Sequence, residues 1–233
     1  MTASTAYLHY SFDLWLTLIR SNPAFKEERA RYFHQYHNSK QKPLSSVQAI
    51  FREVDLMCNA INEKTGGNIS SEEMYLMVIG RINEDVLSVY DTDPEDLYHK
   101  MEVLLLEHMP QVYCANTLPA LAQLRTNTDC SISLLSNTGF IKGPTLRKVL
   151  QALGLDTYLD FQLYSDEAGC SKPNPAFFRL LLDTLDARRP GLDRARIIHV
   201  GDNPNADIAG AKAAGIQSLL VNSNELTILN LLN

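Results

Sequence analysis

Apolar residues follow different patterns in different parts of the chain. The stretch YLHYSF at residues 7–12 is a short run rich in aromatic residues, which is typical of a buried strand. From about residue 22 to residue 110, apolar residues instead recur at i, i+3, i+4 and i+7, a spacing that predicts helices alone. We expect these helices at 24–38, 45–64, 72–83 and from 94 to just before 110.

From residue 116 onward, helical patterns alternate with short apolar runs. The expected helices are 118–125, 145–153, 174–186 and 206–214, and the expected strands are 130–135, 161–164, 196–200 and 218–221. This alternation predicts a parallel sheet covered by helices on both faces. The strand at 7–12 must join that sheet, because it has no other strand near it in the sequence.

The predicted fold is therefore α/β, a doubly wound, Rossmann-like parallel-sheet core with an inserted all-helical domain. Residues 1–20 and 111–233 form the expected core, and residues 21–110 form the expected insertion. A length of 233 residues and a hydrophobic content of 45% suffice for this arrangement.

Charge and cysteine content narrow the possible partners and compartment. A net charge of −6 lacks the basic excess of a nucleic-acid-binding protein. The four scattered cysteines indicate free thiols in a reducing compartment. There is no apolar run of ~18 residues for a membrane span, and the start of the chain does not resemble a signal peptide. We expect a cytoplasmic protein without membrane or nucleic-acid partners, and the sequence does not indicate its oligomeric state.

Polar residues stand at the carboxyl ends of the predicted core strands. Asp13, Ser136 and Asp202 each follow one strand, and Lys172 comes soon after another. Each alone has a plain structural explanation as a helix cap, a loop lysine or a turn residue. Ligands of open α/β sheets bind at this edge, so together these residues predict a site for an oxyanion and a hard divalent metal.

The segment IIHVGDNPNADIAGAKAAGI at residues 197–216 strengthens this prediction. Gly201 permits a sharp exit from the strand, Asp202 is placed to reach a metal, and Asp207 begins the next helix. The small residues that follow allow the helix to pack closely on the sheet, but close packing does not explain acids at both 202 and 207.

Four motifs in chain order resemble those of the haloacid dehalogenase-like (HAD) hydrolase superfamily. FDLWLTL resembles its nucleophile motif, LLSNT its Ser/Thr motif, CSKPNPAFF its Lys motif, and VGDNPNAD its acidic motif. The resemblance covers the whole chain, since the helical insertion falls where this superfamily carries a cap domain.

The resemblance implies hydrolysis of a small phosphomonoester through an aspartyl-phosphate on Asp13. Ser136 and Lys172 would hold the phosphoryl oxygens, and Asp207 would orient Lys172 or a water molecule. Mg²⁺ would be bound by Asp13, Asp202 and the main-chain carbonyl of residue 15. The remaining expected substrate contacts are Thr17, Asn137 and Arg20.

One position departs from the phosphatase pattern. Trp15 stands where phosphatases of the superfamily usually carry a second Asp, and an indole cannot transfer protons at neutral pH. Leu16 likewise replaces a small residue. The dehalogenase branch also lacks that Asp, needs no metal and acts on halogenated acids. The alternatives are therefore such a dehalogenase, or a weakly active ligand-binding protein on this scaffold.

Other polar residues have less specific interpretations. His199, Asp166 and Glu167 are candidate replacements for the missing acid or base, but a core histidine and two loop acids are the simpler interpretation. Arg20 lies beside the expected hinge and could meet an anionic substrate. The other candidates are better explained as solvated helix faces (Arg29, Arg31 and Arg52) or as the core of the cap (Phe25, Tyr32 and Phe33).

Overall fold

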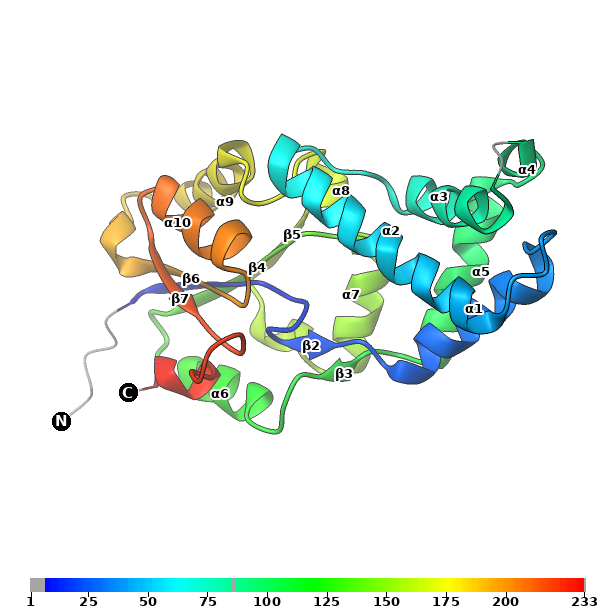
Figure 1. The fold of residues 1–233 in the computed structure, drawn as a ribbon. Helices are drawn as coiled ribbons and strands as arrows, with labels where there is room; N and C mark the ends of the chain where they lie inside the picture. Colours follow the sequence, from blue (N-terminus) through cyan, green and yellow to red (C-terminus); the bar gives the residue numbers. More distant parts are fainter. Residues whose placement is uncertain (1–6, 85–86, 233) are drawn as a thin grey trace.

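A five-stranded parallel sheet organises one half of the molecule (Figure 1). The computed structural model describes residues 7–84 and 87–232. The strand order is β5-β4-β1-β6-β7. The strand bounds are His9–Phe12 (β1), Ser131–Ser136 (β4), Phe161–Tyr164 (β5), Ile197–Gly201 (β6) and Gln217–Leu220 (β7). Phe12 pairs with Leu134 on one side and Val200 on the other, so the carboxyl ends of the central strands meet at one edge.

Helices cover both faces of this sheet, as expected for a doubly wound fold. In Figure 1, α9 and α10 lie above the sheet, and α6 and α7 lie below it. The helices of this half are Thr117–Leu124 (α6), Gly143–Ala152 (α7), Ser165–Ala168 (α8), Pro175–Arg188 (α9) and Gly210–Ala213 (α10). Phe177 and Phe178 of α9 are buried against Leu135 and Ile197 of the sheet. The predicted α/β class is confirmed.

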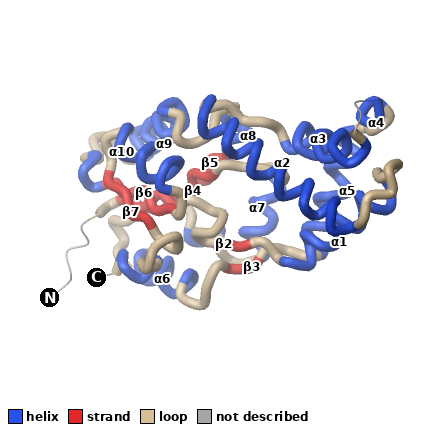
Figure 2. Tube along the Cα trace, in the orientation of Figure 1, coloured by secondary structure: helices blue, strands red, loops and turns tan. Residues whose placement is uncertain are grey.

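The described residues from 23 to 84 and from 87 to 107 are helical wherever they form regular structure, and Figure 2 draws them as helices and loops. The helices are Pro23–Tyr36 (α1), Leu44–Thr65 (α2), Ser71–Asn83 (α3), Leu87–Tyr90 (α4) and Pro94–Glu107 (α5). Helix α1 packs on α2, α2 on α3, and α3 on α5. We call this stretch the helical segment. The exact division into domains at residues 20 and 110 remains a prediction.

Local signals account for the ends of these helices. The Asn22 side chain accepts a hydrogen bond from the amide of Ala24 at the start of α1. Ser70 and Glu73 form a reciprocal capping box at the start of α3. Gly66 ends α2 in the left-handed conformation, with φ of 72°. Phe25 and Phe33 are buried in the helical segment as expected, and Tyr32 is partly buried there.

The five-stranded sheet and the helices that cover it are called the sheet unit here. Two short strands join the sheet unit to the helical segment. Strand β2 (Ile19–Arg20) pairs antiparallel with β3 (Gln111–Val112), so the two chain crossings run side by side. The sequence pattern did not predict this pair, because two residues are too few to show alternation. The predicted helix at 206–214 is also different: it is a π-helical turn, Pro204–Ala209, followed by α10.

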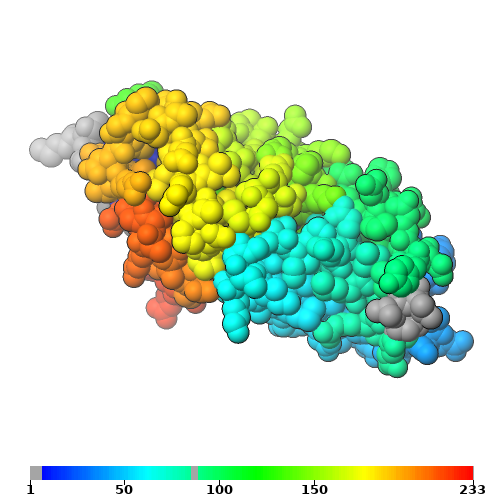
Figure 3. Space-filling view, turned by 90° about the horizontal axis from the view of Figure 1, so that it is seen from above, coloured from blue at the N-terminus to red at the C-terminus, as the bar shows by residue number. Residues whose placement is uncertain are grey.

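The end of α2 and the loop after it lie against the sheet unit, where Figure 3 shows the two surfaces in contact. The Asn174 side chain donates a hydrogen bond to the Gly66 carbonyl. Asn68 accepts hydrogen bonds from Ser165 and Ser171. The helical segment therefore reaches the loop that carries Lys172. None of the helices in the described part of the chain is both long and apolar enough to cross a membrane.

Candidate active site

Lys172 joins two carboxylates at the carboxyl edge of the sheet. Its Nζ donates hydrogen bonds to Asp13 Oδ1, Asp207 Oδ1 and the Leu135 carbonyl, each at 2.7 Å. The side chain is 1% exposed, so these three acceptors hold the ammonium group away from bulk water. Asn137 fixes the loop, because its side chain bonds both the amide and the carbonyl of Lys172.

Asp13 is placed by the strand that precedes it. It follows β1 directly, and its amide donates to the Val200 carbonyl of the neighbouring strand. The Thr17 hydroxyl donates to Asp13 Oδ2 at 3.2 Å, so this buried threonine contacts the candidate nucleophile. Both carboxylate oxygens of Asp13 therefore have a donor.

Asp207 has partners on several sides. The Asn203 amide donates to Asp207 Oδ2 at 2.9 Å, and His199 Nε2 lies 3.0 Å from Oδ1. A Cβ on Gly201 would come within 2.2 Å of this carboxylate, so residue 201 must be glycine for Asp207 to lie here. His199 is buried as expected, but the sequence did not reveal that it contacts Asp207. Its other ring nitrogen bonds Ser11.

Burial and charge shift the ionisation of the whole group. Burial raises the pKa of Asp13 to about 7, although Lys172 opposes the shift. Burial also raises the pKa of Asp202 to about 6. Burial would raise the pKa of Asp207 too, but Lys172 and His199 outweigh it and lower that pKa overall. Burial acts to lower the pKa of Lys172, yet the two acids outweigh it, and that pKa is raised.

The acids are close enough to share a cation. Asp13, Asp202 and Asp207 each offer a carboxylate oxygen within 4.8 Å of the others. Such hard oxygen donors are the ligands that Mg²⁺ takes in proteins. Asp202 is the least buried of the three, and the Lys172 ammonium group donates to Asp13, Asp207 and the Leu135 carbonyl instead, so the oxygens of Asp202 fit this purpose.

Ser136 and Asn137 lie where the strand pattern placed them, at the end of β4. Ser136 is the last residue of the strand rather than the first after it, and its hydroxyl donates to the Asn137 carbonyl. Trp15, which Leu14 separates from Asp13 in the chain, is partly buried. Leu16 is exposed with φ of 59°, and Asn222 donates to its carbonyl.

The remaining candidates lie elsewhere. Arg20 is exposed on β2 at the crossing between the two halves. Asp166 accepts from the Gly143 amide, and Glu167 pairs with Arg147, so both serve the packing of α7 and α8. They belong to helix α8 and not to a loop as expected.

The three arginines of the helical segment do not behave alike. Arg31 and Arg52 are exposed, as expected of solvated helix faces. The same expectation is wrong for Arg29, which is only 7% exposed. Its guanidinium lies over the rings of Phe25, Phe51 and Phe140.

The helical segment also touches the loop after Asp202. Glu63 of α2 accepts hydrogen bonds from the side chains of Asn203 at 2.7 Å and Asn205 at 3.0 Å. The sequence did not single out Glu63, because its helical position resembles that of any solvated acid. This contact holds the end of α2 against the loop that carries Asp202.

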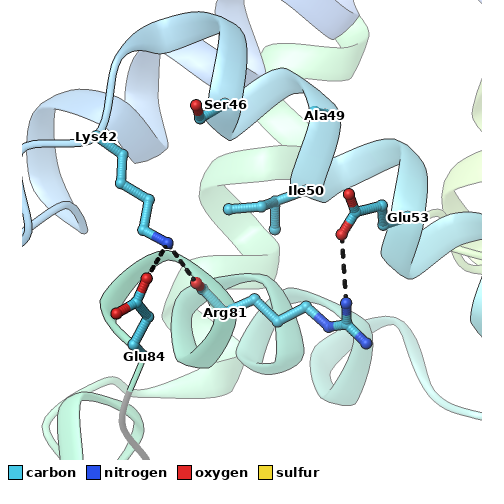
Figure 4. Close-up of a pocket in the computed structure, with 7 residues that line it drawn as sticks. All are labelled: Lys42, Ser46, Ala49, Ile50, Glu53, Arg81 and Glu84. Atoms are coloured by element: carbon cyan, nitrogen blue, oxygen red, sulfur yellow. Dashed lines mark hydrogen bonds and ion pairs between the residues drawn. The ribbon is translucent and has the colours of Figure 1, made fainter.

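A separate cavity of about 390 Å³ lies on the helical segment (Figure 4). Lys42 pairs with Glu84 across it, and Arg81 pairs with Glu53. Its charges therefore satisfy one another, and none of its lining residues belongs to the site around Lys172.

Comparison with known proteins shows the family to which the chain belongs. The family model for haloacid dehalogenase-like hydrolases matches residues 11–215, and the chain belongs to that family. It is 31% identical over 166 residues to a ribulose-1,5-bisphosphate 5-phosphatase of Halopiger xanaduensis, covering 71% of this chain and 64% of that protein. It is 35% identical over 130 residues to a glyceraldehyde 3-phosphate phosphatase of Methanothermobacter thermautotrophicus, covering 56% and 51%. The matches thus span less than two thirds of these relatives.

Solved structures share the fold. A HAD hydrolase of Bacillus subtilis bound to magnesium superimposes with a TM-score of 0.70 at 19% identity, covering 94% of this chain and 90% of that one. A 2-haloacid dehalogenase of Pseudomonas syringae gives a TM-score of 0.59 at 25% identity, covering 93% and 86%. Both likenesses extend over the sheet and the helical segment.

Proposed function

We propose that this protein hydrolyses a small phosphomonoester with the help of Mg²⁺, through a phosphorylated Asp13. One observation carries the proposal: a buried lysine lies between Asp13 and Asp207, with a third carboxylate, Asp202, beside them. A site with one fixed cation and room for a second suits a dianionic phosphoryl group. The two named relatives, both phosphatases by name, support the same class of substrate.

Each residue of the site has a distinct role in this proposal. A carboxylate oxygen of Asp13 attacks phosphorus as the bond from phosphorus to the ester oxygen breaks, and the departing oxygen takes its proton from water, because Trp15 has none to give. A second water molecule then attacks the aspartyl-phosphate and releases phosphate and the free Asp13 carboxylate. Lys172 and Ser136 hold the phosphoryl oxygens, with Asn137 fixing the Lys172 loop. Asp207 keeps Lys172 charged and in place.

The metal site would use Asp13, Asp202 and the main-chain carbonyl of Trp15. When bound, Mg²⁺ supplies positive charge to the phosphoryl oxygens. Thr17 donates to Asp13 and restrains its carboxylate. Arg20, at the crossing, stays a candidate contact for the rest of the substrate. Residues 21–110 would act as a cap that closes over the site and excludes water.

Trp15 supports a second candidate function. The position lacks the acid that would protonate a leaving group, as in the metal-independent dehalogenases of this superfamily. In that case Asp13 would attack carbon and displace a halide from a small haloacid. The paired acids Asp202 and Asp207 favour the phosphatase, because carbon attack requires no cation beside them.

Metal binding separates the two candidates. Thermal unfolding is followed with and without Mg²⁺ in the wild type and in Asp202→Asn, together with assays for released phosphate and chloride. The phosphatase proposal expects Mg²⁺ to stabilise the wild type, less stabilisation in the variant, and phosphate release. Chloride release from a 2-chloro acid without any metal effect would favour the dehalogenase. Ligand-dependent stabilisation without turnover of either substrate would favour a binding protein.

A further inference from the structure

His199 is a fully buried histidine to which the proposed reaction gives no role. It lies on β6, and each of its ring nitrogens has a hydrogen-bond partner. Nε2 lies 3.0 Å from Asp207 Oδ1, and Nδ1 lies 3.0 Å from the Ser11 hydroxyl. The Phe178 ring meets the imidazole edge to face, with ring centres 5.4 Å apart. Two hydrogen bonds and one ring contact therefore fix the position of the imidazole.

These contacts belong to a ring of hydrogen bonds that begins and ends at β1. Ser11 bonds His199, and His199 bonds Asp207. Lys172 Nζ then joins Asp207 Oδ1 to Asp13 Oδ1, at 2.7 Å from each. Ser11 and Asp13 are two positions apart at the end of β1, where side chains at i and i+2 project to the same face. His199 is thus linked to the candidate nucleophile through only two side chains, and both are buried.

Asp207 is restrained at both of its carboxylate oxygens. Oδ2 accepts a hydrogen bond from the Asn203 amide at 2.9 Å, and Oδ1 accepts one from Lys172 Nζ at 2.7 Å. An amide N–H and an ammonium group can only donate, so Asp207 is the ionised acceptor of both. His199 is a further donor to Oδ1 and takes no part in the reaction. A carboxylate held by the Asn203 amide alone could pivot about Oδ2, and Lys172 would then lose its fixed distance from Asp13.

The partners of His199 determine which ring nitrogen carries its proton. Because Asp207 only accepts, Nε2 must carry a hydrogen and donate it. Burial lowers the pKa of His199 and Lys172 lowers it further, although Asp207 opposes the shift, so the ring is neutral. Nδ1 then keeps its lone pair and accepts from the Ser11 hydroxyl.

We propose that His199 is a positioning residue for phosphoryl transfer: its Nε2–H holds Asp207, and Asp207 holds the Lys172 ammonium group against Asp13 and the phosphoryl oxygens. A hydrogen bond to a charged acceptor is stronger than one between neutral groups, which suits this role. The ring neither gains nor loses a proton, so His199 does not replace the acid that is missing at Trp15. The role rests on the proposed phosphatase function.

Two substitutions of His199 separate positioning from packing. The amide nitrogen of glutamine is as many bonds from Cα as Nε2 is, so His199→Gln keeps a donor for Asp207. The amide of asparagine reaches only as far as Nδ1, so His199→Asn keeps a partner for Ser11 and loses the bond to Asp207. Both variants remove the aromatic ring and its contact with Phe178, so the loss of packing is common to the two.

His9 provides the matched control. It is also buried in the sheet and also bonds two side chains, the hydroxyls of Ser131 and Ser133. It is the first residue of β1, at the opposite end of that strand from Asp13. His9→Asn and His9→Gln therefore remove a buried histidine and leave the ring of hydrogen bonds around Lys172 intact.

The kinetic test measures kcat with p-nitrophenyl phosphate and Mg²⁺, corrected for the folded fraction of each variant. We expect kcat to fall by about tenfold or more in His199→Asn, because a hydrogen bond to a charged group is lost, and to fall clearly less in His199→Gln. Both His9 variants should keep the wild-type kcat. An equal fall in the two His199 variants, or no fall in either, would overturn the positioning role. A fall of the same size in the His9 variants would also overturn it.

Nuclear magnetic resonance tests the same role without turnover. Spectra are recorded near pH 7 on protein with ¹⁵N-labelled histidine and lysine, and His199→Gln and Lys172→Arg identify the two signals. We expect a neutral His199 ring protonated on Nε2. The Lys172 ammonium signal should be protected from exchange with water, persist in His199→Gln, and be shifted or lost in His199→Asn.

The spectra decide the proposal even if a variant does not fold or the wild type does not release phosphate. A wild-type His199 ring protonated on Nδ1 would overturn the role, and so would a Lys172 signal that is unchanged in His199→Asn. Should His199→Asn fail to fold, the protonated nitrogen of the wild-type ring decides. The expected spectra together with no hydrolysis by the wild type would count against the phosphatase and not against the positioning of Lys172.

Discussion

Lys172 Nζ lies 2.7 Å from Asp13 Oδ1, although the two residues are 159 positions apart in the chain. The same nitrogen lies 2.7 Å from Asp207 Oδ1. Asp13, Lys172 and Asp207 therefore form one buried cluster. Replacing any one of them changes the pKa values of the other two, because each lies in the electric field of the others.

Replacing Lys172 by Met should abolish turnover and weaken the fold. The change leaves Asp13 and Asp207 buried without their cation, so we expect a loss of about 3 kcal/mol in the free energy of unfolding. Urea unfolding near pH 7.5 measures it. Lys148→Met is the control, because Lys148 forms an exposed pair with Glu102 and should cost less than about 1 kcal/mol. Equal stability of Lys172→Met and the wild type would show that the cluster is not held by charge.

Replacing Trp15 by Asp should raise phosphatase turnover. The position is the one at which an acid could protonate the leaving group, and acid–base help is typically worth ~10²–10⁴ in rate. The substrate for this test is an alkyl phosphate, because its alkoxide is a poorer leaving group than p-nitrophenolate and needs a proton more. We expect kcat for this substrate to rise at least about tenfold in Trp15→Asp. Trp15→Phe, which adds no acid, controls for loss of the indole. A folded Trp15→Asp protein that is no faster would argue against a missing acid.

Replacing Gly201 by Ala should displace Asp207. The new Cβ would lie 2.2 Å from the Asp207 carboxylate, closer than atoms can approach. We expect a loss of at least about tenfold in turnover and lower stability, by about 1–3 kcal/mol. Gly67→Ala serves as a control, since its nearest neighbour, the Thr65 hydroxyl, is 3.4 Å away. Full activity in Gly201→Ala would mean that Asp207 has no fixed position in catalysis.

His9 should make stability depend on pH. It is buried, bonds Ser131 and Ser133, and burial lowers its pKa from 6.5 to about 3. Between these values the unfolded chain binds a proton that the folded protein does not, so stability falls as pH drops from about 6.5 toward about 3.

The measurement for His9 is urea unfolding at pH 7.5 and pH 5. His9→Gln should lose less stability than the wild type over this interval, because glutamine does not titrate. His34→Gln changes an exposed histidine and should follow the wild type. A pH dependence that is identical in all three proteins would remove His9 as its source.

The sequence was informative wherever a local rule determines position. Carboxyl ends of parallel strands share one edge, so Asp13, Ser136 and Lys172 were expected together before any contact was known. Helix ends were equally predictable, since Asn22 and Gly66 are residues that cap helices for reasons internal to a few neighbouring positions.

Contacts between distant segments were not predictable. Arg29 follows the spacing of a solvated helix face, yet it is buried under the rings of Phe25, Phe51 and Phe140, the last of which comes from the other half of the chain. His199 carries the pattern of an ordinary strand residue, and its bond to Asp207 depends on the turn at 204–209. Helical and strand periodicity describe one element at a time and do not report what packs against it.

The most direct test of the central claim is hydrolysis of p-nitrophenyl phosphate with Mg²⁺ and with EDTA, using Asp13→Asn as the blank. We predict turnover that requires Mg²⁺ and that falls by at least about a thousandfold in Asp13→Asn, which removes the attacking carboxylate. Asp13→Asn activity close to that of the wild type, or turnover unchanged by EDTA, would contradict Mg²⁺-dependent attack by Asp13.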